Sequence, residues 1–202
     1  MPGVVKLVCH LWCFFYRWKV VKPDHPIPKR CVVIAGPHTS NWDFGATIAT
    51  AELNGVDMKW LGKREMFDGP LGWLFRYLGG ISVDRGAAGG LVGEMVDLLN
   101  SSEQLAVVVP AEGTRDPVEY WKSGFYRIAK EANVPIQFAY VDKATRSSGF
   151  GPSIDVTGDV RADMDRVRAF YMTKTGIKPN RFNVPRLREE DEEAPGGEPT
   201  EA

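Results

Sequence analysis

RCVVIAGPHTSNWDFGATIATAELNG, residues 30–55, is the stretch that decides the fold. Its apolar run at residues 31–35 predicts a buried strand, which ends where Gly-Pro makes a turn. From Ser40 onward the sequence predicts a helix that continues to about Asn54, with Gly55 as its stop. A buried strand that leads directly into a helix is the repeating unit of α/β folds.

The rest of the chain repeats this alternation. Further strands are predicted at residues 58–63, 81–85, 104–109, 136–142 and 151–160. Helices are predicted at residues 67–80, 87–102, 121–135 and 164–176. Strands that alternate with helices predict an α/β fold, in which a mixed, partly parallel β-sheet is flanked by helices. The length of 202 residues fits one domain, which we place at residues 23–188.

The charge of the chain is distributed unevenly. The net charge is -1, but seven of the 26 acidic residues lie after Arg188, where there is no basic residue. The preceding part therefore carries 25 basic against 19 acidic residues. A basic body suits an anionic partner, such as a phosphorylated substrate or an acidic membrane surface, and no basic helix or RNA-binding signature favours nucleic acid. The acidic tail, residues 189–202, is expected to be disordered.

The first 22 residues form a third predicted region. They are rich in Trp, Phe and Tyr, with Lys6, Arg17, Lys19 and Lys22 around the aromatic residues. This composition predicts a helix that lies in a membrane interface, although a helix packed in the core remains the alternative. No segment reaches the roughly 20 apolar residues of a membrane span. The three cysteines are expected to be reduced thiols in a cytoplasmic protein.

Polar motifs follow four of the predicted strands. His38 follows the first strand, Lys63 ends the second, Arg85 ends the third, and residues 110–115 (PAEGTR) follow the fourth. In open α/β sheets ligands bind beyond the carboxyl ends of the strands. We therefore expect these motifs to share one site.

His38 and Asp43 have two interpretations. Ser40 and Asp43 match a capping box, in which a serine and an acid three residues later bond the first amides of a helix. In the second interpretation, Asp43 orients the His38 imidazole and keeps one ring nitrogen free as a base. The two interpretations are compatible, because Ser40 could still cap the helix.

The EGTR segment and two further cations suit a phosphate group. Gly113 allows backbone to approach a ligand closely, Thr114 can bond phosphate oxygens, and Arg115 offers a planar fork. Taken singly, Lys63 and Arg85 are more typical of solvated surface charges. Together with Arg115 they predict an electropositive pocket beside His38.

These motifs resemble a known family. HTSNWD is an HX4D box, GISVDR resembles a G-x-x-x-D-R motif, and EGTR and VPI resemble the third and fourth motifs of the PlsC-type glycerolipid acyltransferases. K-x-E at residues 63–65 and K-x-G at residues 122–124 fall between them in the same order. The resemblance covers about residues 30–140. Pro110 stands one position early and Phe138 replaces a second proline, which are departures from the common pattern.

The resemblance implies an acyl transfer from a thioester to an alcohol. His38 would be the general base and Asp43 its partner, and Arg85, supported by Lys63, would contact the phosphate of the acceptor. The residues that would shape the acceptor and donor site are Glu112, Gly113, Thr114 and Arg115. Acyl-CoA or acyl-carrier protein would be the co-substrate, with no cofactor and no metal. The acceptor would be a lysophospholipid, with 1-acylglycerol-3-phosphate converted to phosphatidic acid at the inner face of the membrane.

Other functions remain open at this stage. The acceptor could be another lipid, such as a lyso-ornithine lipid or a glycolipid. A thioester hydrolase would use His38 to activate water, and it would not need Arg85 and Arg115 together. A non-catalytic peripheral lipid binder would need Asp43 only as a helix cap.

Overall fold

One seven-stranded sheet organises the part of the chain that the computed structural model describes, residues 3–83 and 90–192. The strand order is β1-β7-β6-β2-β5-β3-β4, and β6–β7 is the antiparallel pair in an otherwise parallel ladder. The strands are β1 (Lys19–Val21), β2 (Arg30–Gly36), β3 (Met58–Lys63), β4 (Gly80–Val83), β5 (Leu105–Val109), β6 (Ile136–Asp142) and β7 (Ser147–Ile154). This mixed, mostly parallel sheet with flanking helices confirms the predicted α/β class.

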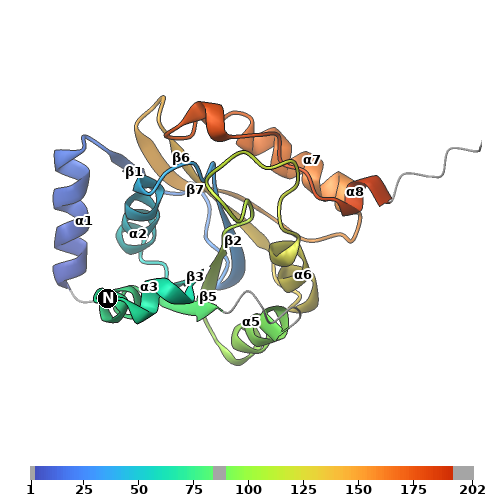
Figure 1. Cartoon of the computed structure of the whole chain (residues 1–202), viewed down its shortest axis with the longest axis horizontal. Helices are drawn as coiled ribbons and strands as arrows, with labels where there is room; N and C mark the ends of the chain where they lie inside the picture. Colours follow the sequence, from blue (N-terminus) through green and yellow to red (C-terminus); the bar gives the residue numbers. More distant parts are fainter. Residues whose placement is uncertain (1–2, 84–89, 193–202) are drawn as a thin grey trace, which may run out of the picture.

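Helices cover both faces of the sheet (Figure 1). One face carries α1 (Gly3–Phe15), α2 (Trp42–Asn54), α3 (Arg64–Asp68) and α4 (Gly72–Tyr77). The other face carries α5 (Gly90–Ser101), α6 (Gly124–Glu131) and α7 (Val160–Tyr171). A short 3-10 helix (Pro179–Arg181) and α8 (Glu189–Glu192) follow.

The central strand β2 shows why its sequence is a continuous apolar run. Val32 and Ile34 belong to the core under α5, α6 and α7, whereas Cys31 and Val33 belong to the core under α1 to α4. Successive side chains of a strand point to opposite faces of the sheet. A parallel strand covered on both faces therefore needs apolar residues at every position.

The predicted helix at residues 67–80 is two helices. α3 begins earlier, at Arg64, and α4 begins at Gly72, with Gly69 and Pro70 between them. Proline lacks an N–H and its ring clashes with the preceding turn, so it interrupts a helix. A Cβ at Gly72 would collide with the carbonyl of Phe67, which shows how tightly the chain turns here.

The predicted helix over residues 1–22 is too long. α1 ends at Phe15, Arg17 has a positive φ of 50°, and β1 joins the edge of the sheet in parallel with β7. The Trp18 indole also donates a hydrogen bond to Ser148 Oγ at 2.9 Å. Pairing with a strand 130 residues away is a tertiary contact that local composition does not reveal.

Two further boundaries are corrected by the structure. Residues 189–192, predicted as the start of a disordered tail, form α8, in which Glu190 is buried and pairs with Arg168 at 2.7 Å. The strand predicted at residues 151–160 is β7 and ends at Ile154. α7 then begins at Val160, because the Asp159 side chain accepts a hydrogen bond from the Ala162 amide and caps it.

Candidate active site

The His38 turn leaves the carboxyl end of β2, between its neighbours β5 and β6. His38 Nδ1 lies 3.4 Å from Oδ2 of Asp43, which sits in the first turn of α2. This separation is slightly beyond the usual N–H···O range of about 2.7–3.2 Å. The His38 side chain is 26% exposed and that of Asp43 is 4% exposed. A buried carboxylate thus faces an imidazole that solvent can reach.

The same Asp43 oxygen also closes the turn before α2. The amides of Thr39 and Ser40 each donate to Asp43 Oδ2 at 2.7 Å, and the Trp42 amide donates to Ser40 Oγ at 3.3 Å. These bonds are close to the predicted capping box. The N-cap residue of α2 is Asn41, whose side chain makes no capping bond, and not the predicted Ser40. Asp43 therefore bonds the turn before the helix and also faces the His38 imidazole. Asp43 Oδ1 is buried and has no hydrogen-bond partner among the described residues.

A second buried carboxyl supports the turn from the neighbouring strand. Glu112 follows β5, and its Oε1 accepts a hydrogen bond from the His38 amide at 2.6 Å. Burial raises the pKa of Glu112 from 4.5 to about 8; the bond from His38 opposes the rise and the charge of Asp43 adds to it. Glu112 was expected to shape the substrate site, and its contact in the structure is with the backbone of the predicted base.

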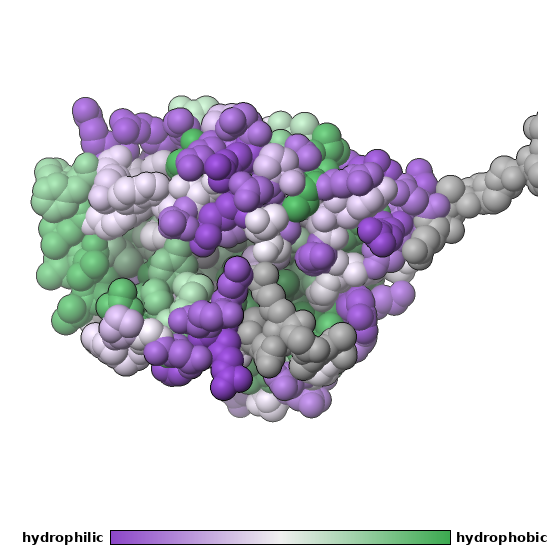
Figure 2. Space-filling model, in the orientation of Figure 1, coloured by the Kyte–Doolittle hydropathy of each residue, from purple (hydrophilic) through white to green (hydrophobic). Residues whose placement is uncertain are grey.

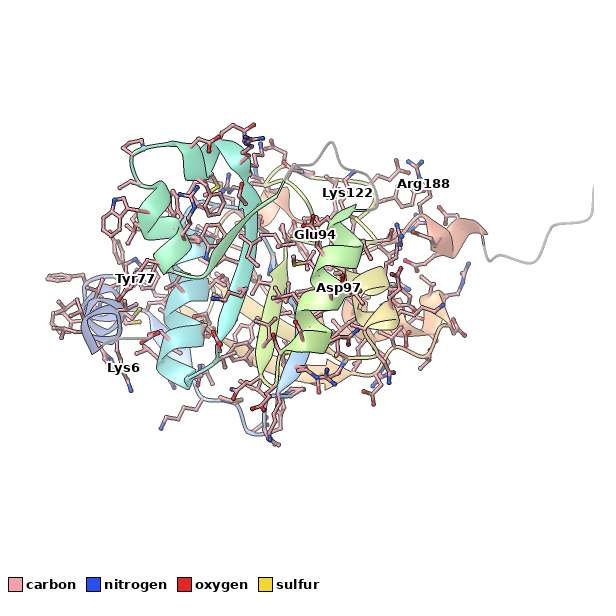
Figure 3. The ribbon with its side chains drawn as sticks, turned by 90° about the horizontal axis from the view of Figure 1, so that it is seen from below. Lys6, Tyr77, Glu94, Asp97, Lys122 and Arg188 are labelled. Carbon is pink, nitrogen blue, oxygen red and sulfur yellow. The ribbon has the colours of Figure 1, made fainter. Side chains whose placement is uncertain are left out.

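The rest of the EGTR segment faces outward. Gly113 has a φ of 71°, and Thr114 and Arg115 are exposed. The aliphatic part of Lys122 covers Gly113, because a Cβ there would lie 3.1 Å from Lys122 Cγ. The Lys122 amide donates to the Ala111 carbonyl at 2.7 Å, which ties the loop to the start of the K-x-G motif. Lys122 is labelled in Figure 3.

The predicted site residues fall into three groups. His38, Asp43 and Glu112 are joined by direct contacts. Lys63 ends β3, and Arg115 follows the carboxyl end of β5; both are exposed. Neither has a contact with His38 among the described residues. Arg85 lies outside the described residues.

The segment after α7 supports the turn in a way that sequence reasoning missed. The Lys178 amide donates to Thr39 Oγ1 at 3.0 Å, and Gly176 packs against Thr39.

The last residue of α7 supports the strands before the turn. The hydroxyl of fully buried Tyr171 donates toward the carbonyls of Ile34 at 2.6 Å and Ala139 at 3.0 Å. A tyrosine within the predicted helix at residues 164–176 was an available signal, because a buried phenol needs a hydrogen-bond partner.

The described residues form a small cavity and a larger one near the sheet. One, of about 10 Å³, is lined in part by Ala35 of β2 and Thr47 of α2, the strand that precedes His38 and the helix that carries Asp43. A larger one, of about 270 Å³, lies at the amino ends of β2, β3 and β5 and is lined in part by His25. The larger cavity thus lies at the amino ends of the strands, opposite the carboxyl ends where His38 lies.

Comparison with known proteins gives a family for this arrangement. The chain is similar in structure to the crystal structure of the 1-acyl-sn-glycerophosphate (LPA) acyltransferase PlsC from Thermotoga maritima, with a TM-score of 0.55. The two are 20% identical in sequence, and the similarity covers 77% of this chain and 69% of the other. At this identity the likeness shows a shared fold. No curated protein matches the chain in sequence. The model of the Acyltransferase family matches residues 17–141, more than half of the chain, and the chain therefore belongs to the Acyltransferase family.

Proposed function

We propose that this acyltransferase moves a fatty acyl group from acyl-CoA or acyl-carrier protein to the hydroxyl of a lysophospholipid. The favoured acceptor is 1-acylglycerol-3-phosphate, which would give phosphatidic acid. The observation that carries the proposal is the approach of His38 Nδ1 to Asp43 Oδ2, at the carboxyl end of the central strand. Family membership supplies the reaction class.

The proposed chemistry uses the two nitrogens of one imidazole. Asp43 accepts a hydrogen bond from Nδ1–H of His38, which keeps the proton on Nδ1 and leaves Nε2 free as the base. Nε2 removes the hydroxyl proton of the acceptor while its oxygen attacks the thioester carbonyl. The carbon–sulfur bond then breaks, and the departing thiolate takes up the proton from the imidazolium. The amides of Thr39 and Ser40 keep the Asp43 carboxylate in place throughout.

The proposed acceptor is anionic, and the edge of the site carries cations. Lys63 and Arg115 are exposed at the carboxyl end of the sheet, and we assign Arg85 to the same role from its motif. Arginine matches the geometry of a phosphate group with two parallel N–H donors. The structurally similar PlsC is an LPA acyltransferase, which favours a lysophosphatidic acid acceptor for this chain as well.

A lipid acceptor requires a membrane, and an apolar surface lies beside the site. Large apolar side chains of α1 are exposed, and Figure 2 shows a broad hydrophobic area over this helix. They are Val4, Leu7, Val8, Leu11, Phe14 and Phe15. The Tyr16 ring packs against Trp42 in a tilted arrangement with ring centroids 4.7 Å apart, which brings this surface to the residue next to Asp43.

α4 adds to the same side of the molecule. Leu71, Trp73 and Tyr77 are exposed, and Tyr77 lies on the α1 side in Figure 3. No helix among residues 3–83 and 90–192 is long and apolar enough to cross a bilayer. We propose that the protein binds peripherally to the cytoplasmic face of a membrane through α1. Lys6 of α1 and the basic residues that follow the helix, Arg17, Lys19 and Lys22, would lie on anionic lipid.

The test is lipid synthesis by the purified protein. Acyl-CoA and acyl-carrier protein are offered with a panel of lysolipids, and the products are identified by mass spectrometry. We expect acyl transfer to lysophosphatidic acid, with His38→Ala and Asp43→Asn each lowering kcat about 10³-fold. His25→Ala, at the opposite edge of the sheet, is the matched histidine control and should leave the rate unchanged.

The alternatives give different products. A thioester hydrolase releases free fatty acid with or without a lysolipid, and a different acylated lipid identifies a different acceptor. A His38→Ala variant with the wild-type rate of thiol release would disprove the proposed base.

A further inference from the structure

We propose that Glu112 is a positioning residue that fixes the backbone of His38, and that it is not a ligand of the substrate. The inference rests on the proposed function, in which His38 is the base. It replaces the expectation that Glu112 shapes the acceptor and donor site.

The first support is the hydrogen bonding of the turn. Three consecutive amides, those of His38, Thr39 and Ser40, donate to two buried carboxyl groups. Glu112 accepts the first, and Asp43 accepts the second and third. Glu112 therefore holds the turn on the β5 side while Asp43 holds it on the α2 side. With all three bonds made, the Cα–Cβ direction of His38 is fixed before any substrate arrives.

The second support is the enclosure of the Glu112 side chain. Glu112 is 4% exposed. A Cβ at Gly36 would lie 3.6 Å from Glu112 Oε1 and 3.2 Å from Cε1 of Tyr171, so the carboxyl packs directly over the backbone at Gly36. Tyr171 is itself fixed by its bonds to the Ile34 and Ala139 carbonyls. The carboxyl thus has little freedom to move toward a substrate.

The third support is the contrast with the next residues of the same motif. Thr114 and Arg115 are exposed at the edge of the sheet, whereas Glu112 points back to β2. The Gly113 amide donates to the Pro110 carbonyl at 3.0 Å, which closes the turn that separates the two directions. One short motif therefore divides into an inward support and an outward binding edge.

The kinetic test compares Glu112→Gln with Glu112→Ala. Gln retains an oxygen that can accept the His38 amide, so we expect its kcat to stay within about tenfold of wild type. Ala removes the acceptor, and we expect kcat to fall about 100-fold while both KM values stay within about threefold. A Glu112→Gln variant with wild-type kcat and an acceptor KM raised more than about tenfold would overturn the proposal.

Arg115→Gln is the matched control from the same motif. It lies at the proposed phosphate edge, so it should raise the acceptor KM more than it lowers kcat. If Arg115→Gln and Glu112→Ala showed the same pattern, dominated by KM, the division of the motif would be wrong.

A second readout does not depend on activity. Hydrogen exchange of the His38 amide is followed by NMR in wild type and in Glu112→Ala. We expect exchange to accelerate about 100-fold in the variant, with global stability measured in parallel to correct for any loss of fold. Unchanged protection after this correction would overturn the proposal. If the wild type transferred no acyl group but the exchange difference were present, the proposed function alone would fail.

The stability of the fold against pH gives a third readout. The Glu112 pKa is raised from 4.5 to about 8 in the folded state, so the folded protein binds this proton more tightly than the unfolded chain does. The contribution of Glu112 to stability is therefore full below about pH 4.5 and is lost as pH rises through about 8. Asp43 and Tyr171 are the titratable side chains that interact with its charge, and His38 contacts it through the backbone amide.

Glu112→Gln removes this titration. The wild type should lose unfolding free energy relative to the variant as pH rises from about 5 to about 8. Parallel pH profiles of the two proteins would show that the carboxyl is not enclosed, and they would overturn the proposal.

Discussion

The two faces of the sheet differ in how completely their apolar side chains are buried. The face under α5, α6 and α7 holds the large side chains that are completely enclosed, among them Phe125, Met164 and Tyr171. The face under α1 to α4 buries Cys31 and Val33 of the same central strand. Its outermost helix, however, leaves a row of aliphatic and aromatic side chains in solvent (Figure 2).

The candidate site draws on both faces. Asp43 comes from α2, on the face with the exposed apolar row. Tyr171 comes from α7, on the face under α5, α6 and α7, which we call the closed face, and Glu112 lies with Tyr171 beside Gly36. A site of this kind needs rigid support on one side and access on the other. The closed face therefore provides the support. In our proposal the face under α1 to α4, the open face, provides access for the lipid.

The largest expected effect is on the closed face. Phe125 is 0% exposed in the core between α6 and the sheet, and Phe125→Ala should lower the unfolding free energy by about 4 kcal/mol. Phe14 of α1 is 76% exposed, so Phe14→Ala should change it by less than about 0.5 kcal/mol. Urea denaturation without lipid measures both. Equal losses would mean that α1 packs as a core helix, the alternative considered from its sequence.

The sequence predicted best what local signals determine. The apolar run of β2, the Gly-Pro turn and the helix after Ser40 are encoded in neighbouring residues. Gly55 ends α2 as expected, and the structure shows that it does so in the left-handed conformation. β3 occupies the predicted residues 58–63. Alternation of strands with helices was enough for the fold class, because parallel strands require such crossovers.

What the sequence could not show depends on contacts between distant segments. β1 exists because it pairs with β7, and α8 exists in part because Glu190 meets Arg168. The contact of Glu112 with the His38 amide joins residues 74 positions apart. The motif named Glu112 as a site residue. Its contact with the His38 amide forms only because β5 pairs with β2 in the folded sheet.

The second prediction concerns the open face in the presence of lipid. Phe14→Ser and Phe15→Ser together should lower partitioning to vesicles of phosphatidylglycerol and phosphatidylcholine about 100-fold. Each substitution removes the favourable transfer of an exposed phenyl ring from water into lipid. Vesicle sedimentation measures the effect.

Met172→Ser is the matched control for this test. Met172 is an exposed apolar residue that follows α7, on the closed face, and its replacement should leave partitioning unchanged. Equal binding by all three proteins would remove the proposed role of α1. A concentration-dependent change of mass without lipid would assign the surface to a second copy of the chain.

The smallest expected effect concerns the segment that closes the edge of the closed face. Arg168 of α7 donates to Glu190 Oε2 at 2.7 Å, and Glu190 Oε1 accepts the Leu187 amide at 2.7 Å. Glu190→Gln keeps an acceptor for that amide but removes the charge that faces Arg168, so it should cost about 1 kcal/mol of unfolding free energy. Glu131→Gln is the control, because its 3.7 Å pair with Arg127 is half exposed and should be worth about 0.3 kcal/mol. Urea denaturation in low and high salt separates them, since salt screens the exposed pair more than the enclosed one. Equal and fully salt-sensitive losses would show that α8 rests on α7 only loosely, and that the closed face ends before it.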